Sequence, residues 1–454
     1  MRKYFGTDGI RRIANTELSP ELVYKVAKAG AYVLSKHTDH TPTILIGRDT
    51  RISGTLIESA MVAGFLSYGA NVKLLGVIPT PAVAYLTRKL NADAGVVISA
   101  SHNTYEFNGI KYFSNKGTKI LDSLEEEIEE VMDSGKLEEL TAVNDKIGVS
   151  EYKLDLIDEY VYFFRKNFDD NIEKYNKKDF VVGIDTANGA TYSVAEKVFK
   201  ALGINYKIIN NQPDGININQ NCGSTHLENL KKFVLENKLS LGIAYDGDGD
   251  RCLAIDEKGN EIDGDKLLAI ISSNLRKKGK LNKDTIVATV MSNLGLNKYA
   301  RDNGLELLQT KVGDRYVLEE MLKDGFNLGG EQSGHIILLD YNPTGDGILT
   351  SLMLIQSILE EGKKASELNK IVKLYPQVLI NAKVNGDKKY DYDKNKEIKQ
   401  AIEKLEKEFA GNGRVLIRPS GTEPLVRVMI EGEEQEYITK KAKEIADLIE
   451  KNLK

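Results

Sequence analysis

One arrangement occurs three times along the chain: a short apolar strand, a polar loop, an amphipathic helix, a glycine and a second strand. The copies cover residues 43–76, 181–210 and 285–313, and the glycines that follow their helices are Gly69, Gly203 and Gly304. Glycine suits the left-handed residue just past a helix end, and β-branched apolar strands are typical of parallel sheets buried on both faces. Because the copies lie far apart, the repeat predicts three similar α/β domains.

A different pattern fills the C-terminal part of the chain. Strand-like runs at 376–384, 413–421 and 424–432 precede a final helix at 433–454, which predicts a smaller α+β domain. A chain of 454 residues is also too long for one hydrophobic core. The predicted fold class is therefore α/β, with three similar mixed α/β domains and a smaller C-terminal α+β domain. The predicted boundaries give domains of residues 1–153, 154–254, 255–370 and 371–454.

The charge balance limits the partners that we expect. The chain has 62 Lys and Arg residues against 67 Asp and Glu, a net charge of −5. This balance provides no broad positive field for nucleic acid or an anionic membrane, so an anionic ligand must be met by a local cluster. Cys222 and Cys252 are the only cysteines, and no apolar signal or spanning segment is evident. We therefore expect a reduced, cytoplasmic protein with neither a nucleic-acid nor a membrane partner.

The loop "YDGDGDRC" carries three alternating carboxylates, Asp246, Asp248 and Asp250, directly after the strand-like "LGIAY". Carboxylates this close repel one another unless a cation neutralises them, and hard oxygen ligands favour magnesium or calcium. A divalent metal site is the interpretation that we favour over a solvated acidic turn. An EF-hand is excluded because Arg251 stands where its sharp turn needs glycine. An aspartyl phosphatase, with a carboxylate of this loop as the nucleophile, stays open.

A second polar loop follows the apolar run "AGVVI" and contains Ser99, Ser101, His102 and Asn103. Ligands usually bind at the carboxyl ends of strands in such folds, so Ser101 could be a nucleophile that faces a substrate. Lys111 follows after Asn108-Gly109, which we predict to be a turn that folds the lysine back toward the serine. The alternative is that Ser99 and Ser101 only cap the next helix or turn.

Three further segments offer groups for a phosphorylated sugar. "GEQSGH" places Glu331, Ser333 and His335 in a glycine-rich loop, where they could bind sugar hydroxyls or where His335 could be structural. "RPSGTEP" and the strand after it resemble a phosphate cradle or an ordinary tight turn. Its residues are Arg418, Ser420, Gly421, Thr422 and Arg427. Near the N-terminus, another phosphate could be met by a cluster of arginines, unless they are simply solvated. These are Arg11, Arg12, Arg48 and Arg51.

Taken together, these motifs resemble a known family. "FGTDGIR", "GRDTR", "ISASHN", "NGIK", "DGDGDR", "GEQSGH", "TGDGI" and "RPSGTEP" follow one another in the order found in the α-D-phosphohexomutases. The resemblance runs from Met1 to about Lys440 and implies four domains around a central cleft. Two positions depart from the family pattern: Thr104 replaces a proline, and Arg12 replaces a glycine. Losing the proline removes a backbone restraint from the serine loop but no reacting group.

The resemblance implies a role for each residue of the motifs. Ser101 matches the serine that carries a phosphoryl group, and Asp246, Asp248 and Asp250 match magnesium ligands, with phosphorylated Ser101 as a further ligand. Arg251, Lys111 and His335 match catalytic positions that stabilise the phosphoserine, transfer a proton or orient the reacting hydroxyl. The substrate-binding positions implied are Arg11, Glu331, Ser333, Arg418, Ser420, Gly421, Thr422 and Arg427.

The activity implied is the reversible interconversion of glucosamine 6-phosphate and glucosamine 1-phosphate. It would use a phosphoserine enzyme, one Mg²⁺ and a sugar bisphosphate as intermediate or primer, and would feed the synthesis of UDP-N-acetylglucosamine and cell-wall precursors. A homodimer is the oligomer that the resemblance suggests. Glucose or mannose phosphates are the alternative substrates, and the difference rests chiefly on Gln332. Outside the family, an aspartyl-type sugar phosphatase and a non-catalytic phosphosugar sensor remain as alternatives.

Overall fold

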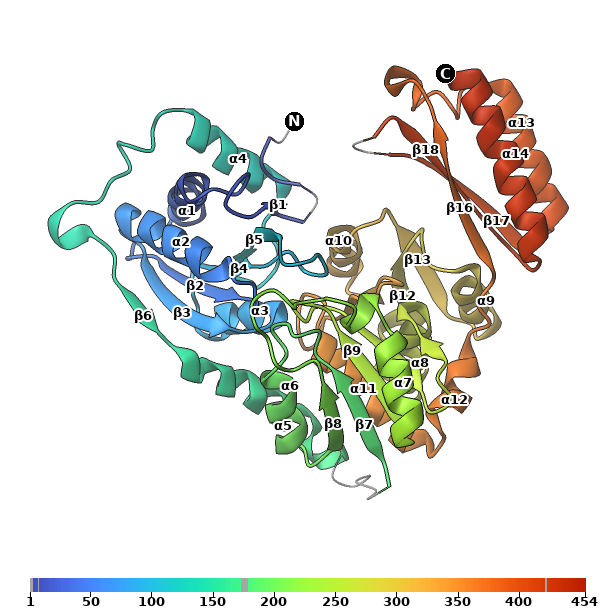
Figure 1. Cartoon of the computed structure of the whole chain (residues 1–454), viewed down its shortest axis with the longest axis horizontal. Coiled ribbons are helices and arrows are strands. Elements are labelled where there is room, and N and C mark those ends of the chain that lie inside the picture. The colour runs from blue at the N-terminus through green and yellow to red at the C-terminus, as the bar shows by residue number, and fades with distance from the viewer. Residues whose placement is uncertain (1–2, 7, 173–178, 421–422) are drawn as a thin grey trace. The chain divides into compact units, whose positions relative to one another are not determined.

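The structure is a computed structural model that describes residues 3–6, 8–172, 179–420 and 423–454. It divides into two compact units, the first formed by residues 1–291 and 305–371 and the second by residues 292–304 and 372–454. Within the described residues four sheets follow one another along the chain, as the four predicted domains require (Figure 1). None of the helices in the described ranges is both long and apolar enough to cross a membrane.

The first sheet has six strands in the order β1-β5-β4-β2-β3-β6. Helices α1, α2 and α4 supply the apolar core on one side of it, while α3 packs on β2 and β4. The elements are β1 (Ile10–Ile13), α1 (Pro20–Ser35), β2 (Thr43–Arg48), α2 (Gly54–Tyr68), β3 (Asn71–Val77), α3 (Thr80–Lys89), β4 (Ala94–Ile98), β5 (Phe107–Ser114), α4 (Asp122–Asp133) and β6 (Ser150–Tyr152).

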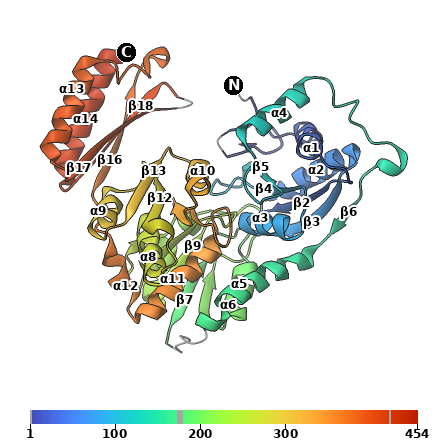
Figure 2. The same cartoon turned by 180° about the vertical axis from the view of Figure 1, so that it is seen from behind.

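The second sheet has five strands in the order β11-β10-β9-β7-β8, and the third has four in the order β13-β12-β14-β15. The elements of the second are α5 (Ile157–Ile172), β7 (Val181–Asp185), α6 (Val194–Ala201), β8 (Asn205–Ile209), α7 (Glu228–Asn237), β9 (Leu241–Tyr245), β10 (Cys252–Asp256) and β11 (Glu261–Ile262). Those of the third are α8 (Gly264–Lys277), β12 (Thr285–Thr289), α9 (Leu294–Asp302), β13 (Glu306–Thr310), α10 (Asp314–Asp324), β14 (Leu328–Gly330), β15 (Ile336–Leu338), α11 (Gly347–Glu361) and α12 (Ala365–Leu368). Helices α8 and α11 pack together (Figure 2).

The three sheets share one topology, which confirms the predicted repeat. In each, two parallel strands are joined by a helix, a third parallel strand lies beside the first, and an antiparallel strand follows the third. The corresponding orders are β3-β2-β4-β5, β8-β7-β9-β10 and β13-β12-β14-β15. Gly69, Gly203 and Gly304 all have positive φ, so each adopts the backbone predicted after its helix.

The C-terminal sheet is antiparallel, with the order β16-β18-β17, and helices α13 and α14 pack on one of its faces. The elements are β16 (Gln377–Lys383), α13 (Lys396–Phe409), β17 (Gly413–Pro419), β18 (Leu425–Gly432) and α14 (Gln435–Leu453). The three strands and the final helix were predicted, whereas α13 was not. Alternation along β18 buries Val426, Val428 and Ile430 in the core of this domain, so Arg427 lies on the opposite face.

Candidate active site

The polar loops singled out in the sequence occupy equivalent places in the three similar sheets. Each joins the third parallel strand to the antiparallel strand beside it. Ser101 lies between β4 and β5, the aspartates lie between β9 and β10, and Glu331 to His335 lie between β14 and β15. The repeat therefore places three loops at the same position of three similar sheets. The side chains of the first two loops contact each other directly.

Ser101 is the contact point between the first two loops. Its side chain is buried, and its Oγ donates a hydrogen bond to Oδ2 of Asp246 at 2.8 Å. Its backbone has a φ of 51°, in the left-handed region that residues other than glycine seldom adopt. A strained buried serine pointing at a carboxylate is a feature of functional sites rather than of simple caps.

Ser99, which directly follows β4, makes hydrogen bonds that support this loop. Its Oγ donates to Asp49 Oδ2 at 2.6 Å and accepts a hydrogen bond from the Ser101 amide at 2.9 Å. The alternative that both serines only cap the next helix or turn fits Ser99, whose Oγ accepts from the amide two residues further on. It does not fit Ser101, whose Oγ bonds to Asp246 in another loop.

The predicted turn at Asn108-Gly109 is wrong. Both residues lie inside β5, and Gly109 is opposite Arg11 of β1. A Cβ on Gly109 would come within 2.5 Å of the Ile10 and Ser99 carbonyl oxygens, so the glycine is needed for close strand packing rather than for a turn. The chain reverses earlier, between β4 and β5, and Lys111 reaches the site from within the strand.

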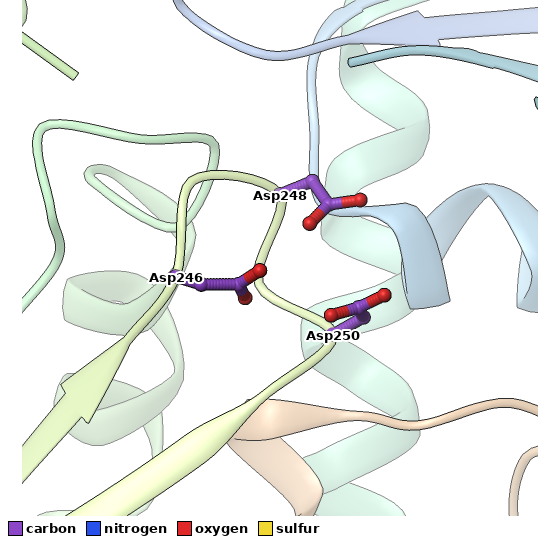
Figure 3. A group of neighbouring side chains, drawn as sticks. All are labelled: Asp246, Asp248 and Asp250. Carbon is purple, nitrogen blue, oxygen red and sulfur yellow. The ribbon is translucent and has the colours of Figure 1, made fainter. Parts of the chain in front are cut away.

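The three aspartates form a compact buried cluster. One ligand atom from each of Asp246, Asp248 and Asp250 lies within 4.8 Å of the others. Figure 3 shows the three side chains pointing toward a common space. Burial and the charges of Asp250 and Asp248 raise the pKa of Asp246 well above its usual value. Oδ1 of Asp248 and Oδ1 of Asp250 are buried, and neither accepts a hydrogen bond from the described residues. Because buried carboxylate oxygens need a partner, these atoms fit a divalent cation.

Positively charged side chains lie beside the three aspartates. Lys111 Nζ lies 3.0 Å from Asp248 Oδ2, 3.1 Å from Asp8 Oδ2 and 3.8 Å from Asp250 Oδ2. Burial alone would lower the pKa of Lys111, but these carboxylates raise it above its usual value, so the side chain is an ammonium ion. Burial alone would raise the pKa of Asp250, but His335, Lys111 and Arg251 hold it below its usual range.

Arg251 links the aspartate loop to the serine loop. Its amide donates to Asp246 Oδ1 at 3.1 Å, and its Nη1 lies 3.3 Å from Nδ1 of His102. Because an arginine can only donate, Nδ1 of His102 accepts and this ring is neutral. Burial and the charges of Arg251 and Arg11 lower the pKa of His102 to about 4. Burial alone would lower the pKa of Arg251, but Asp250 and Asp246 raise it.

His335 is held between two carboxylates. Its Nδ1 lies 3.5 Å from Asp250 Oδ2, and its Nε2 lies 3.6 Å from Asp314 Oδ2. Burial alone would lower the pKa of His335, but Asp250 and Asp314 raise it. The Gly345 amide donates to Nε2 at 3.0 Å, which favours the neutral ring with its proton on Nδ1. A Cβ on Gly345 would lie 2.5 Å from the ring, so this glycine is needed to seat the imidazole.

The other polar residues of the "GEQSGH" loop differ from His335, and from one another, in their surroundings. Glu331 Oε1 accepts a hydrogen bond from the Gly313 amide at 3.2 Å, while Ser333 is exposed. Gln332, on which the sugar preference was expected to rest, donates to Asp263 Oδ2 at 3.2 Å and so binds within its own domain.

Sequence reasoning missed three charged residues that complete the site. Asp8, Lys119 and Asp314 continue a series of alternating acidic and basic side chains from Lys111 to His335. Lys119 forms ion pairs with Asp8 and with Asp314, the latter at 2.6 Å. Asp8 belongs to the "FGTDGIR" motif, so its motif was a usable signal, whereas Lys119 and Asp314 lie outside the motifs quoted above.

The four N-terminal arginines differ in burial and in the groups that they contact. Arg11 is partly buried, with Nη2 2.8 Å from Asp8 Oδ2 and Nη1 3.3 Å from Asn103 Oδ1. Arg48 pairs with Glu58 at 3.4 Å, and Arg12 donates to the Lys3 carbonyl. Arg51 is fully buried, so the expectation that it is solvated or meets a ligand phosphate is wrong.

The C-terminal domain carries its own cationic pair. Arg418 of β17 stands directly opposite Arg427 of β18 on the face away from the helices. Burial and the charge of Arg427 lower the pKa of Arg418, and an anion would relieve the repulsion. The side chain of buried Ser420 accepts a hydrogen bond from the Glu423 amide at 3.2 Å. Gly421 and Thr422 lie outside the described residues.

Comparison with known proteins defines the class. Models of the phosphoglucomutase/phosphomannomutase α/β/α domains I, II and III match residues 2–139, 158–259 and 263–375, and the C-terminal domain model matches residues 379–448. The chain therefore belongs to the phosphoglucomutase/phosphomannomutase family, the phosphohexomutases, and is an enzyme of the mutase class.

Curated relatives narrow the position of the chain within this family. It is 54% identical over 453 residues to a phosphoglucosamine mutase of Acetivibrio thermocellus and 54% identical over 455 residues to one of Clostridium botulinum. It is 53% identical over 453 residues to the phosphoglucosamine mutase of Ruminiclostridium cellulolyticum. In all three cases 100% of both chains is covered.

Solved structures show the same fold at low identity. A phosphoglucomutase/phosphomannomutase family protein of Burkholderia thailandensis has a TM-score of 0.78 and 21% identity, over 98% of this chain and 96% of that one. The N-acetylphosphoglucosamine mutase of Aspergillus fumigatus, solved in complex with GlcNAc-6P and magnesium, has a TM-score of 0.67 and 16% identity, over 100% and 96% of the chains. The fold is thus that of the phosphohexomutases.

Proposed function

We propose that this enzyme interconverts glucosamine 6-phosphate and glucosamine 1-phosphate through phosphorylated Ser101 and a glucosamine 1,6-bisphosphate. One observation carries the proposal: Ser101 Oγ lies 2.8 Å from Asp246 within a buried carboxylate cluster, in a chain that is 54% identical to a phosphoglucosamine mutase over its full length. The product would feed the synthesis of UDP-N-acetylglucosamine and cell-wall precursors.

The residues that would hold Mg²⁺ are Asp246, Asp248 and Asp250, together with phosphorylated Ser101. The two buried carboxylate oxygens without hydrogen bonds support this assignment. When bound, the ion would neutralise charge on the phosphoryl oxygens during transfer. Arg251 adds a fixed positive charge beside the same oxygens, since its amide and guanidinium already join the two loops.

Ser101 solves a geometric problem, because O6 and O1 are far apart on a rigid sugar ring. In the forward direction the bond from phosphorus to Oγ breaks, a bond from phosphorus to O1 forms, and the proton leaves O1 and ends on the Oγ of Ser101, which gives the bisphosphate and the free serine hydroxyl. The sugar then turns over, and its 6-phosphate returns to Ser101. Lys111, held as an ammonium ion by its carboxylates, and His335, fixed by Asp250 and Gly345, would orient the reacting hydroxyl.

The remaining residues would hold the parts of the substrate that do not react. Glu331 and Ser333 would bind sugar hydroxyls, and Arg11 would steady a phosphate near Asn103. The C-terminal set would grip the distal phosphate, which the facing pair Arg418 and Arg427 supports. That set is Arg418, Ser420, Gly421, Thr422 and Arg427.

A glucose or mannose phosphate is the second candidate substrate, favoured by the names of the four domain models. Any of these sugars would use the same serine and metal loops. We also propose a cytoplasmic location, which the two free, buried cysteines suit. The homodimer remains a prediction.

Phosphorus NMR would test the proposed function. The enzyme, Mg²⁺ and a trace of sugar bisphosphate are incubated separately with glucosamine 6-phosphate, glucose 6-phosphate and mannose 6-phosphate. We expect a 1-phosphate to form fastest from glucosamine 6-phosphate. Faster conversion of glucose or mannose would move the proposal to the second candidate. Release of inorganic phosphate alone would instead support an aspartyl phosphatase.

A further inference from the structure

The backbone carbonyls of the serine loop converge on one buried side chain. Arg51 Nη2 donates to the Ser101 carbonyl at 3.0 Å and to the Asn103 carbonyl at 2.8 Å, and Nη1 donates to the Thr104 carbonyl. Asp49 orients the guanidinium, since its Oδ2 lies 2.8 Å from Arg51 Nε. The buried guanidinium thus directs four of its five N–H groups to protein acceptors.

A second side chain reaches the same carbonyls from the second α/β domain. Asn219 Nδ2 donates to the Ser101 carbonyl and to the Asn103 carbonyl, both at 2.8 Å. Asn219 is buried, and its own amide donates to the Ala187 carbonyl at 2.9 Å. The serine loop is therefore bound by a guanidinium from its own domain and by a carboxamide from the domain that carries the aspartates.

The aspartate loop packs against this junction. A Cβ on Gly247 would lie 2.5 Å from the Ser101 carbonyl oxygen and 2.7 Å from Asn219 Nδ2. Only a glycine lets the backbone between Asp246 and Asp248 approach so closely. The contacts of Arg51, Asn219 and Gly247 thus all meet at the carbonyl of Ser101. Ser101 is also the residue with the left-handed φ of 51°.

We propose that Arg51 and Asn219 are positioning residues. They hold Ser101 in its left-handed conformation and fix the position of the serine loop relative to the aspartate loop. Neither side chain touches the hydroxyl of Ser101, so both act on catalysis through the backbone. This inference rests on the proposed function.

The inference is tested with Asn219→Ala and Arg51→Lys. Lysine keeps the charge of Arg51 but cannot reach three carbonyls as a fork. The matched control is Asn221→Ala, because Asn221 also has a left-handed φ, 52° against 58° for Asn219, but is exposed. The measurements are kcat and KM for glucosamine 6-phosphate, the Mg²⁺ concentration for half-maximal rate, the melting temperature, and phosphorylation of Ser101 by mass spectrometry.

We expect kcat to fall about 10²-fold in both variants, since misplacing a reacting group by about 1 Å costs this much. KM should stay within about twofold of the control, because neither residue contacts the substrate. Phosphorylation of Ser101 by a sugar bisphosphate should slow by a similar factor. If Asn219→Ala does not fold, Asn219→Gly replaces it, because glycine adopts the left-handed φ of 58° without strain and also lacks the two donated hydrogen bonds.

A kcat equal to that of Asn221→Ala in any folded Asn219 variant would overturn the inference. So would a loss of rate that is fully recovered by raising Mg²⁺, because the residue would then serve only the metal loop. Wild-type enzyme that turns over no sugar phosphate would instead refute the proposed function, so the two failures are distinguishable.

Discussion

Ser101 Oγ donates a hydrogen bond to Asp246 Oδ2 at 2.8 Å, although 145 positions separate the two residues. The contact joins equivalent loops of two repeated sheets, each placed between a parallel strand and an antiparallel strand. Repetition of one topology thus brings a serine hydroxyl and a carboxylate cluster together. The following predictions address the parts of this arrangement separately.

Replacing Ser101 with alanine should reduce turnover to background and leave phosphosugar binding in place. The variant loses the only oxygen proposed to carry the phosphoryl group, while the buried network around Ser99 and Asp49 stays intact. Turnover is measured together with binding by calorimetry. Ser59→Ala on α2, an exposed serine bonded to the Thr55 carbonyl, is the control and should behave as wild type. Activity of Ser101→Ala near that of the control would remove Ser101 from the mechanism.

Asp248→Asn should lose most activity at saturating substrate and require more Mg²⁺. The substitution removes one of the three carboxylate charges available to the cation, at a position where Thr80 and Lys111 already bind Oδ2. Rates are measured across a Mg²⁺ titration. Asp145→Asn, an exposed acidic residue, serves as the control. An unchanged Mg²⁺ dependence in Asp248→Asn would count against the metal assignment.

Gly345→Ala should lower kcat strongly, because a Cβ there would lie 2.5 Å from the His335 ring and displace it. A suitable control is Gly386→Ala, where the nearest atom is 3.9 Å away, in ordinary contact. Steady-state rates and melting temperatures of the two variants are compared. Full activity in Gly345→Ala would mean that the seated position of His335 is unimportant for the reaction.

Acid should destabilise the metal-free, unphosphorylated protein partly through His102. Burial and the nearby Arg251 lower the pKa of this histidine from 6.5 to about 4 in the folded state. Between these values the unfolded chain binds more protons than the folded one, so stability rises with pH and falls on acidification. His102→Gln should therefore lose less melting temperature than wild type between about pH 6.5 and about pH 4.5. Equal losses would show that His102 is not held neutral.

Arg418→Ala should raise KM for glucosamine 6-phosphate and change kcat less. Arg418 faces Arg427 across two strands, and an anion between them would relieve their repulsion. Lys399→Ala on the exposed side of α13 is the charge-matched control. An unaffected KM in Arg418→Ala would move the distal phosphate site elsewhere.

The sequence predicted the fold well because its periodic strands and the glycines after the helices report local structure. It located the loops that carry the aspartates, Ser101 and His335, because hydroxyls and carboxylates follow buried strands there. The predicted turn at Asn108-Gly109 was wrong because this dipeptide fits both a turn and a tightly packed central strand. Only the carbonyl groups that surround Gly109 in the fold distinguish the two. Sequence reasoning also missed Asn219 and Asp314, whose roles depend on contacts with residues distant in the chain.

The most direct test of the central claim is to locate the phosphoryl group on the enzyme. The protein is incubated with Mg²⁺ and glucosamine 1,6-bisphosphate, treated or not with alkaline hydroxylamine, digested and analysed by mass spectrometry. The account predicts a phosphate on the peptide that contains Ser101, stable to hydroxylamine and transferred to O1 when glucosamine 6-phosphate is added. A hydroxylamine-sensitive phosphate on the peptide that contains Asp246, with inorganic phosphate as the product, would contradict it.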